Sequence, residues 1–120
     1  MRICLFLFFF FLIVTIHGQV QINELCASNG DVIYDPDFIN FPDWVELHNT
    51  ANSPADVSGF FLSDNQNEIL KWRIPPGTVI DSKGYLIVWC DGLNTKLHSN
   101  FSLDADGETL ILSGSTGARI

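Results

Sequence analysis

Turn-forming residues divide this chain into short segments, and this pattern limits the possible folds more than any other feature of the sequence. Gly, Pro, Asn and Asp separate apolar stretches at intervals of roughly eight to twelve residues, a spacing typical of β-sandwiches and barrels. Residues 70–74 (LKWRI) alternate cleanly, with Leu70, Trp72 and Ile74 on one face, as in a half-buried strand. No window of about eleven or more residues repeats apolar residues at helical spacing. The sequence therefore predicts one all-β domain.

The same criteria predict strands in several other stretches. In residues 44–49 (WVELHN), Val45 and Leu47 should face the core, whereas Glu46 and His48 should face solvent. Trp72 and Trp89 are predicted to be largely buried, since each side chain can bury about 200 Å². Asp106-Gly107 predicts the tight turn of a hairpin formed by residues 101–112. The other predicted strands are residues 20–26, 60–63, 78–81 and 85–90.

Residues 1–18 (MRICLFLFFFFLIVTIHG) predict a secretory signal peptide. After Arg2 the sequence is apolar from Ile3 to Val14, a length that suits a signal and falls short of the roughly 20 residues that span a bilayer. Gly18 supplies a small residue at the cleavage position. We therefore expect a secreted, extracellular domain of residues 19–120 with no membrane span after cleavage. An uncleaved membrane anchor is the alternative.

The chain is acidic. Its formal net charge is −8 at pH 7 and becomes about −9 once Arg2 is removed with the signal, because Arg carries one positive charge. Such a domain is repelled by the phosphates of nucleic acid and by anionic lipid, so neither is expected as a partner.

Secretion also affects the cysteines. Cys4 would leave with the signal, so that Cys26 and Cys90 remain in an oxidising compartment. We expect them to form a disulfide that closes a loop of about 65 residues, with two separate buried thiols as the alternative. Neither cysteine has a partner at the spacing of zinc ligands, which argues against a cysteine zinc site.

Six stretches in order resemble the lamin tail domain, the immunoglobulin-like module of nuclear lamins that also occurs in many secreted proteins. They lie between residue 22 and the end of the chain and read INELCASN, DWVELHN, DVSGFFLSD, KWRIPPGTVI, GYLIVWCDG and GETLIL. The resemblance implies an immunoglobulin-like β-sandwich that makes contacts and has no catalytic activity of its own. Two features depart from the nuclear members. The chain is acidic and carries a signal, so nuclear partners do not carry over, and it stops at GSTGARI, where the family continues its last strand. It is therefore either a minimal version or a fragment of a longer protein.

No arrangement of residues in the sequence predicts an active site. His48 and His98 are both interpreted as solvated, and no nucleophile lies at a motif spacing from either. Asp43 and Glu46 are three residues apart in an extended segment and point to opposite faces, so they cannot act as an acid–base pair. We therefore predict that the chain is not an enzyme.

Two acidic groups offer the oxygen ligands that Ca²⁺ prefers. Neither follows the spacing of an EF-hand, so both are interpreted as solvated, and no metal or cofactor is expected. The acidic groups are Asp31, Asp35, Asp37 and Asp43 in one loop, and Asp104, Asp106 and Glu108 in one turn.

Asn100 begins the sequence NFS, an N-glycosylation sequon that requires an outward-facing side chain.

Residues 27–42 (ASNGDVIYDPDFINFP) form the predicted contact loop. Tyr34, Phe38 and Phe41, with Trp44 just beyond, alternate with acidic residues, a mixture that suits protein or glycan partners. The alternative is that these aromatic side chains pack over the open end of the sandwich. We expect a secreted, non-catalytic interaction module. The other hypothesis is an accessory domain at the N-terminus of a larger secreted enzyme, which an open reading frame beyond Ile120 would indicate.

Overall fold

The computed structural model describes residues 19–27, 33–104 and 109–120, and within these ranges every regular element is a β-strand. Most strands are short, because Gly, Pro and Asn interrupt them. In order they are β1 (Val20–Cys26), β2 (Trp44–Asn49), β3 (Ala55–Asp56), β4 (Phe61–Ser63), β5 (Trp72–Arg73), β6 (Val79–Ile80), β7 (Tyr85–Trp89) and β8 (Ile111–Ser113).

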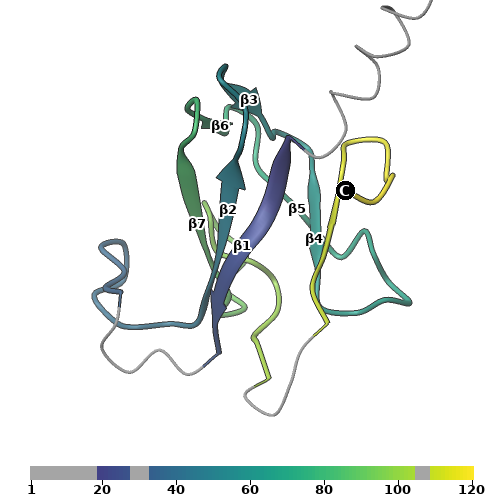
Figure 1. Cartoon of the computed structure of the whole chain (residues 1–120). Coiled ribbons are helices and arrows are strands. Elements are labelled where there is room, and N and C mark those ends of the chain that lie inside the picture. Colours follow the sequence, from purple (N-terminus) through teal and green to yellow (C-terminus); the bar gives the residue numbers. More distant parts are fainter. Residues whose placement is uncertain (1–18, 28–32, 105–108) are drawn as a thin grey trace, which may run out of the picture.

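The strands form two facing three-stranded sheets and one small two-stranded sheet. The first sheet has the order β1-β2-β7, and the second has the order β5-β4-β8; both are antiparallel. The pair β3-β6 lies at one end of the two sheets (Figure 1). The described residues therefore form a β-sandwich, which confirms the predicted all-β fold.

Alternation along the strands places apolar side chains between the sheets. Val45, Leu47 and Val88 point inward from the first sheet and are completely buried. Leu62 and Trp72 join them from the second sheet, and Trp72 is 5% exposed. The inward positions of Val45 and Leu47 and the burial of Trp72 are as predicted.

The outer face of the first sheet is also covered in part. Trp44 and Trp89 lie opposite each other in the β2–β7 register, and both are buried although neither belongs to the core between the sheets. The predicted burial of Trp89 is confirmed, but it packs on the outer face. Further along this face, His48 stacks on Tyr85 with ring centroids 4.3 Å apart and is only half-buried.

The predicted hairpin of residues 101–112 is not formed by the described residues. Its turn, Asp106-Gly107, lies outside them, and residues 101–104 contain no strand. β8 pairs instead with β4, so that Leu112 lies opposite Leu62. Burial of both leucines in the core favours this long-range pairing over a local one.

The structure contradicts the predicted disulfide, because Cys26 and Cys90 are both free thiols. Cys26 pairs with Trp44 on β2, and Cys90 directly follows β7 on the other side of β2. Two strand spacings separate them, about 9.6 Å, whereas a disulfide needs Cα atoms within roughly 7 Å. In addition, Cys90 belongs to the core, while Cys26 lies opposite the outward-facing Trp44.

Burial of Cys90 makes its thiol unreactive. Burial raises the pKa of the Cys90 thiol to about 12, and the neighbouring carboxylate of Asp91 adds to this effect. At pH 8, only about one molecule in ten thousand would carry the nucleophilic thiolate. We expect iodoacetamide to leave Cys90 unmodified in the native protein and to label it after unfolding, as measured by mass spectrometry. Half-buried Cys26 is the internal control, and equal labelling of the two residues would contradict the expectation.

The part of the chain that the structure describes contains no helix long and apolar enough to cross a membrane.

Candidate functional site

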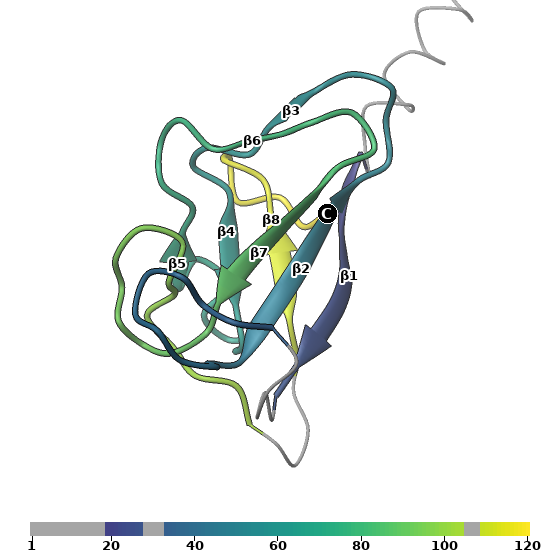
Figure 2. The ribbon, with the colours of Figure 1, turned by 90° about the vertical axis from the view of Figure 1, so that its left-hand side faces the viewer.

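Two loops meet at the end of β7 (Figure 2), and a buried histidine lies between carboxylates from both of them. The aromatic loop comprises residues 33–43 and leads into β2, and the histidine loop comprises residues 90–99 and follows β7. Backbone hydrogen bonds from Trp89 N to Leu97 O and from Ser99 N to Trp89 O, both 2.8 Å, fold the histidine loop back against β7.

His98 lies at the centre of this group and is completely buried. Its ring stacks near that of Trp89, at 6.4 Å between centroids, and the edge of Phe38 approaches it at 4.9 Å. The interpretation of His98 as a solvated loop residue is therefore wrong. The histidine loop turns this side chain inward, where the aromatic loop covers it.

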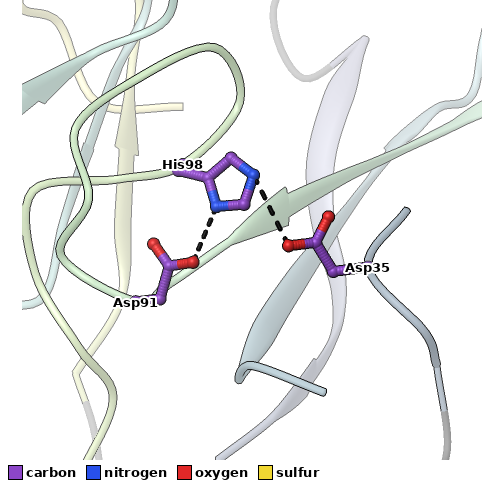
Figure 3. A group of neighbouring side chains, drawn as sticks. All are labelled: Asp35, Asp91 and His98. Carbon is purple, nitrogen blue, oxygen red and sulfur yellow. Dashed lines mark hydrogen bonds and ion pairs between the residues drawn. The ribbon is translucent and has the colours of Figure 1, made fainter. Parts of the chain in front are cut away.

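Three carboxylates surround the His98 ring. Nδ1 is 2.7 Å from Asp91 Oδ2, whereas Nε2 is 3.3 Å from Asp37 Oδ2 and 3.8 Å from Asp35 Oδ2. Figure 3 shows Asp91 and Asp35 on opposite sides of the ring, approaching it from the two different loops. We call His98, Asp35, Asp37 and Asp91 the His98 cluster.

The buried acid of this cluster is Asp35, whose side chain is completely inaccessible to solvent. Its Oδ1 accepts a hydrogen bond from Asp37 N at 2.9 Å and so shapes the loop. Its Oδ2 has no hydrogen-bond partner among the described residues. A buried carboxylate oxygen of this kind is costly unless positive charge compensates it.

Asp37 connects the cluster to the surface. Its Oδ1 lies 3.2 Å from the ammonium nitrogen of Lys96 on the histidine loop. The hydrogen bonds from Lys96 and His98 lower the pKa of Asp37 below its ordinary value. Asp37 therefore remains a carboxylate at neutral pH and joins the two loops on their solvent side.

The pairing of His98 with Asp91 is similar to the base and orienting acid of a catalytic triad, but the rest of the triad is missing. In a triad the second ring nitrogen faces a nucleophile, whereas Nε2 here faces two carboxylates. The neighbouring hydroxyl of Ser99 donates to Phe101 O at 2.8 Å instead. Within the described residues, the His98 cluster therefore lacks the geometry for nucleophilic catalysis.

A mainly apolar cavity of the described structure lies elsewhere. The start of β1, strand β3 and residues 114–120 line it, and its charged side chains are Asp56 and Arg119. Its described lining contains neither histidine nor cysteine.

Apolar side chains are exposed on the two loops around the buried cluster. Tyr34 is 48% and Phe41 38% exposed, and their rings form an edge contact at 5.5 Å. Trp44 departs from the prediction, because it is only 3% exposed and lies against the sheet. We define the aromatic surface as Tyr34, Phe38, Ile39, Phe41 and Leu93, all of which are exposed.

Asn100, Asp43 and Asp104 are predicted site residues that do not belong to the aromatic surface. Asn100 is exposed and donates from its side chain to Lys71 O at 2.8 Å. Asp43 accepts a hydrogen bond from Cys90 N through its backbone, and Asp104 is exposed. Asp31, Asp106 and Glu108 lie outside the described residues.

Comparison with known proteins agrees with this architecture. No curated protein matches the chain. Residues 14–120 match the family model of the Lamin Tail Domain, and the match covers the eight described strands and both loops. The sandwich, the order of the strand motifs and this match together show that the chain belongs to the lamin tail domain family, whose β-sandwich serves as an interaction module.

Proposed function

We propose that this chain is a secreted, non-catalytic binding domain that contacts a protein or glycan through its aromatic surface. The observation that supports this proposal most strongly is that the exposed aromatic side chains lie on loops that the buried His98 cluster holds together. Tyr34, Phe38 and Phe41 are each between 38% and 48% exposed. Aromatic rings of this kind contribute most to binding when their loops are already ordered.

The aromatic loop is ordered by its own hydrogen bonds. Asp35 N donates to Asn40 O at 2.9 Å, and Ile39 N donates to Asp35 O at 3.1 Å. Ile39, at the tip, has a φ of 57° and is 75% exposed. A β-branched residue rarely adopts this left-handed conformation, and such strain is concentrated at functional sites. The loop thus presents a large apolar side chain where glycine or asparagine would be less strained.

Charge limits the kind of partner. The chain carries a formal net charge of −8, so polyanionic glycans and nucleic acids are disfavoured. Neutral sugars and apolar protein patches can pack on the faces of tyrosine and phenylalanine rings. Export by residues 1–18 would bring the domain to such partners outside the cell.

We expect Tyr34→Ala and Phe41→Ala each to weaken binding at least about tenfold, the effect of losing one central aromatic contact. The full chain would be produced in a secreting host, where N-terminal sequencing should find Gln19 first. The secreted domain would then be tested on an array of neutral glycans and against extracellular proteins.

The matched control is Val79→Ala, which removes an exposed apolar side chain from β6, outside both loops. It should leave the affinity unchanged. Equal losses for Val79→Ala and Phe41→Ala, or full affinity in both loop variants, would contradict the proposed surface. Retention of residues 1–18 would contradict secretion through a cleaved signal.

A further inference from the structure

We propose that the His98 cluster is a divalent metal site of the zinc type, with His98 Nε2, Asp35 Oδ2 and Asp37 Oδ2 as ligands. This inference does not depend on the proposed binding function, because it concerns the buried side of the loops. One coordinating atom each of His98, Asp35 and Asp91 lies within 4.8 Å of the others. Asp37 is not part of that group, and we include it because its Oδ2 lies 3.3 Å from His98 Nε2.

The orientation of the ring indicates which nitrogen is available. Asp91 Oδ2 is 2.7 Å from Nδ1, so it accepts the Nδ1 hydrogen, and Nε2 then faces the other two carboxylates. Histidine ligands in metal sites commonly donate their second ring nitrogen to a carboxylate in this way, which fixes the tautomer. Asp91 is therefore the positioning residue, and the ligands are on the Nε2 side.

The distances around Nε2 suit a metal ion better than a proton. A proton on Nε2 can serve one acceptor well, and its nearest acceptor, Asp37 Oδ2, is 3.3 Å away, longer than the roughly 2.7–2.9 Å of charge-assisted pairs. Zinc bonds of about 2.0–2.2 Å place tetrahedral ligands roughly 3.3–3.6 Å apart. The 3.3 Å and 3.8 Å separations from Nε2 approach this spacing.

The unpartnered oxygen of Asp35 is an independent observation. Asp35 Oδ2 is buried, has no hydrogen-bond partner in the part of the chain that the structure describes, and points toward Nε2 (Figure 3). A cation between these atoms would compensate its charge, whereas a single proton directed at Asp37 would leave it uncompensated. One imidazole nitrogen with two carboxylate oxygens is a ligand set for zinc, because calcium sites use oxygen ligands.

Isothermal titration calorimetry of the secreted protein with ZnCl₂, after treatment with a chelator, tests the site. We expect one Zn²⁺ per chain, a raised melting temperature, and binding weakened at least tenfold in both Asp35→Asn and Asp37→Asn. Asp37 is at the surface, so its variant remains informative if Asp35→Asn fails to fold. Asp56→Asn, an equal change of charge at the exposed end of β3, should bind as the unmodified protein does.

Cobalt provides a second readout that reports the ligands directly. Co²⁺ should give visible bands without the near-ultraviolet charge-transfer band of thiolate ligation, since both cysteines lie outside the cluster. Absence of saturable Zn²⁺ binding, unchanged affinity in Asp37→Asn, preference for Ca²⁺ over Zn²⁺, or a thiolate band with Co²⁺ would each overturn the proposal.

Discussion

Replacing His98 with alanine should lower the free energy of unfolding by about 3–5 kcal/mol, the cost of removing one partner from a buried charged group. The substitution leaves the buried carboxylate of Asp35 and the half-buried carboxylate of Asp91 without the ring that lies between them. It also opens a cavity beneath Phe38 and beside Trp89. Urea denaturation of the chelator-treated protein measures the change.

His48→Ala is the matched control. The His48 ring is half-buried on the outer face, where it stacks on Tyr85 and contacts Gly84 O through Nδ1. Its removal should cost about 1 kcal/mol or less, as for exposed stacking and a single hydrogen bond. In His98→Ala, hydrogen exchange should also become faster at the amides of Asp35 and Ser99. A cost below about 1 kcal/mol for His98→Ala would show that the cluster does not hold the loops.

Asn49→Asp should lower the free energy of unfolding by about 3 kcal/mol or more. Asn49 ends β2 and is completely buried, and its Nδ2 donates to the carbonyls of Ser53, Ile80 and Asp81 at 2.8, 3.1 and 3.0 Å. Aspartate has nearly the same shape, but it would place a carboxylate oxygen against three carbonyl oxygens. The resulting repulsion is confined to the junction between β2 and the β3–β6 pair.

Asn65→Asp provides the comparison at an exposed turn. Asn65 Oδ1 accepts a hydrogen bond from Asn67 N at 2.9 Å, and aspartate can accept the same bond. The free energy of unfolding, measured by thermal or urea denaturation, should therefore change by no more than about 0.5 kcal/mol. Similar effects of the two substitutions would mean that the Asn49 amide does not connect β2 to the β3–β6 pair.

The sequence was sufficient to predict β2, whereas of residues 70–74 only Trp72–Arg73 form a strand and Leu70, predicted on the same face as Trp72, is exposed. Val45 and Leu47 on β2 are separated by Glu46, and this period of two identifies the inner face before any pairing is known. The two-residue strands β3 and β6 are too short to show a period, so they were missed or overextended. The pairing of β8 with β4 also has no local signal, because it depends on the burial of Leu62 against Leu112.

Predictions based on side-chain chemistry succeeded less often than those based on strand periodicity. Asp91 and His98 are seven residues apart, but Asp35 reaches them only because the aromatic loop folds over the end of β7. A histidine between Leu97 and Ser99 in a polar loop has no pattern that indicates burial. The disulfide failed for a similar reason, since the position of β2 between β1 and β7 is a property of topology. Trp44 and Phe41 are both aromatic and close in sequence. Trp44 is buried because it lies on β2 opposite Trp89 of β7, whereas Phe41 precedes the strand and is exposed.

Site-specific photo-cross-linking tests the aromatic surface most directly. The photoreactive residue benzoylphenylalanine would replace Phe41 in one variant and Val79 in another. Each secreted variant would be irradiated in the presence of the extracellular material of the secreting cells. The proposed function predicts a single discrete adduct, protein or glycan, from position 41 and none from position 79. Adducts of equal yield from both positions, or none from position 41 while position 79 reacts, would contradict binding through the aromatic surface.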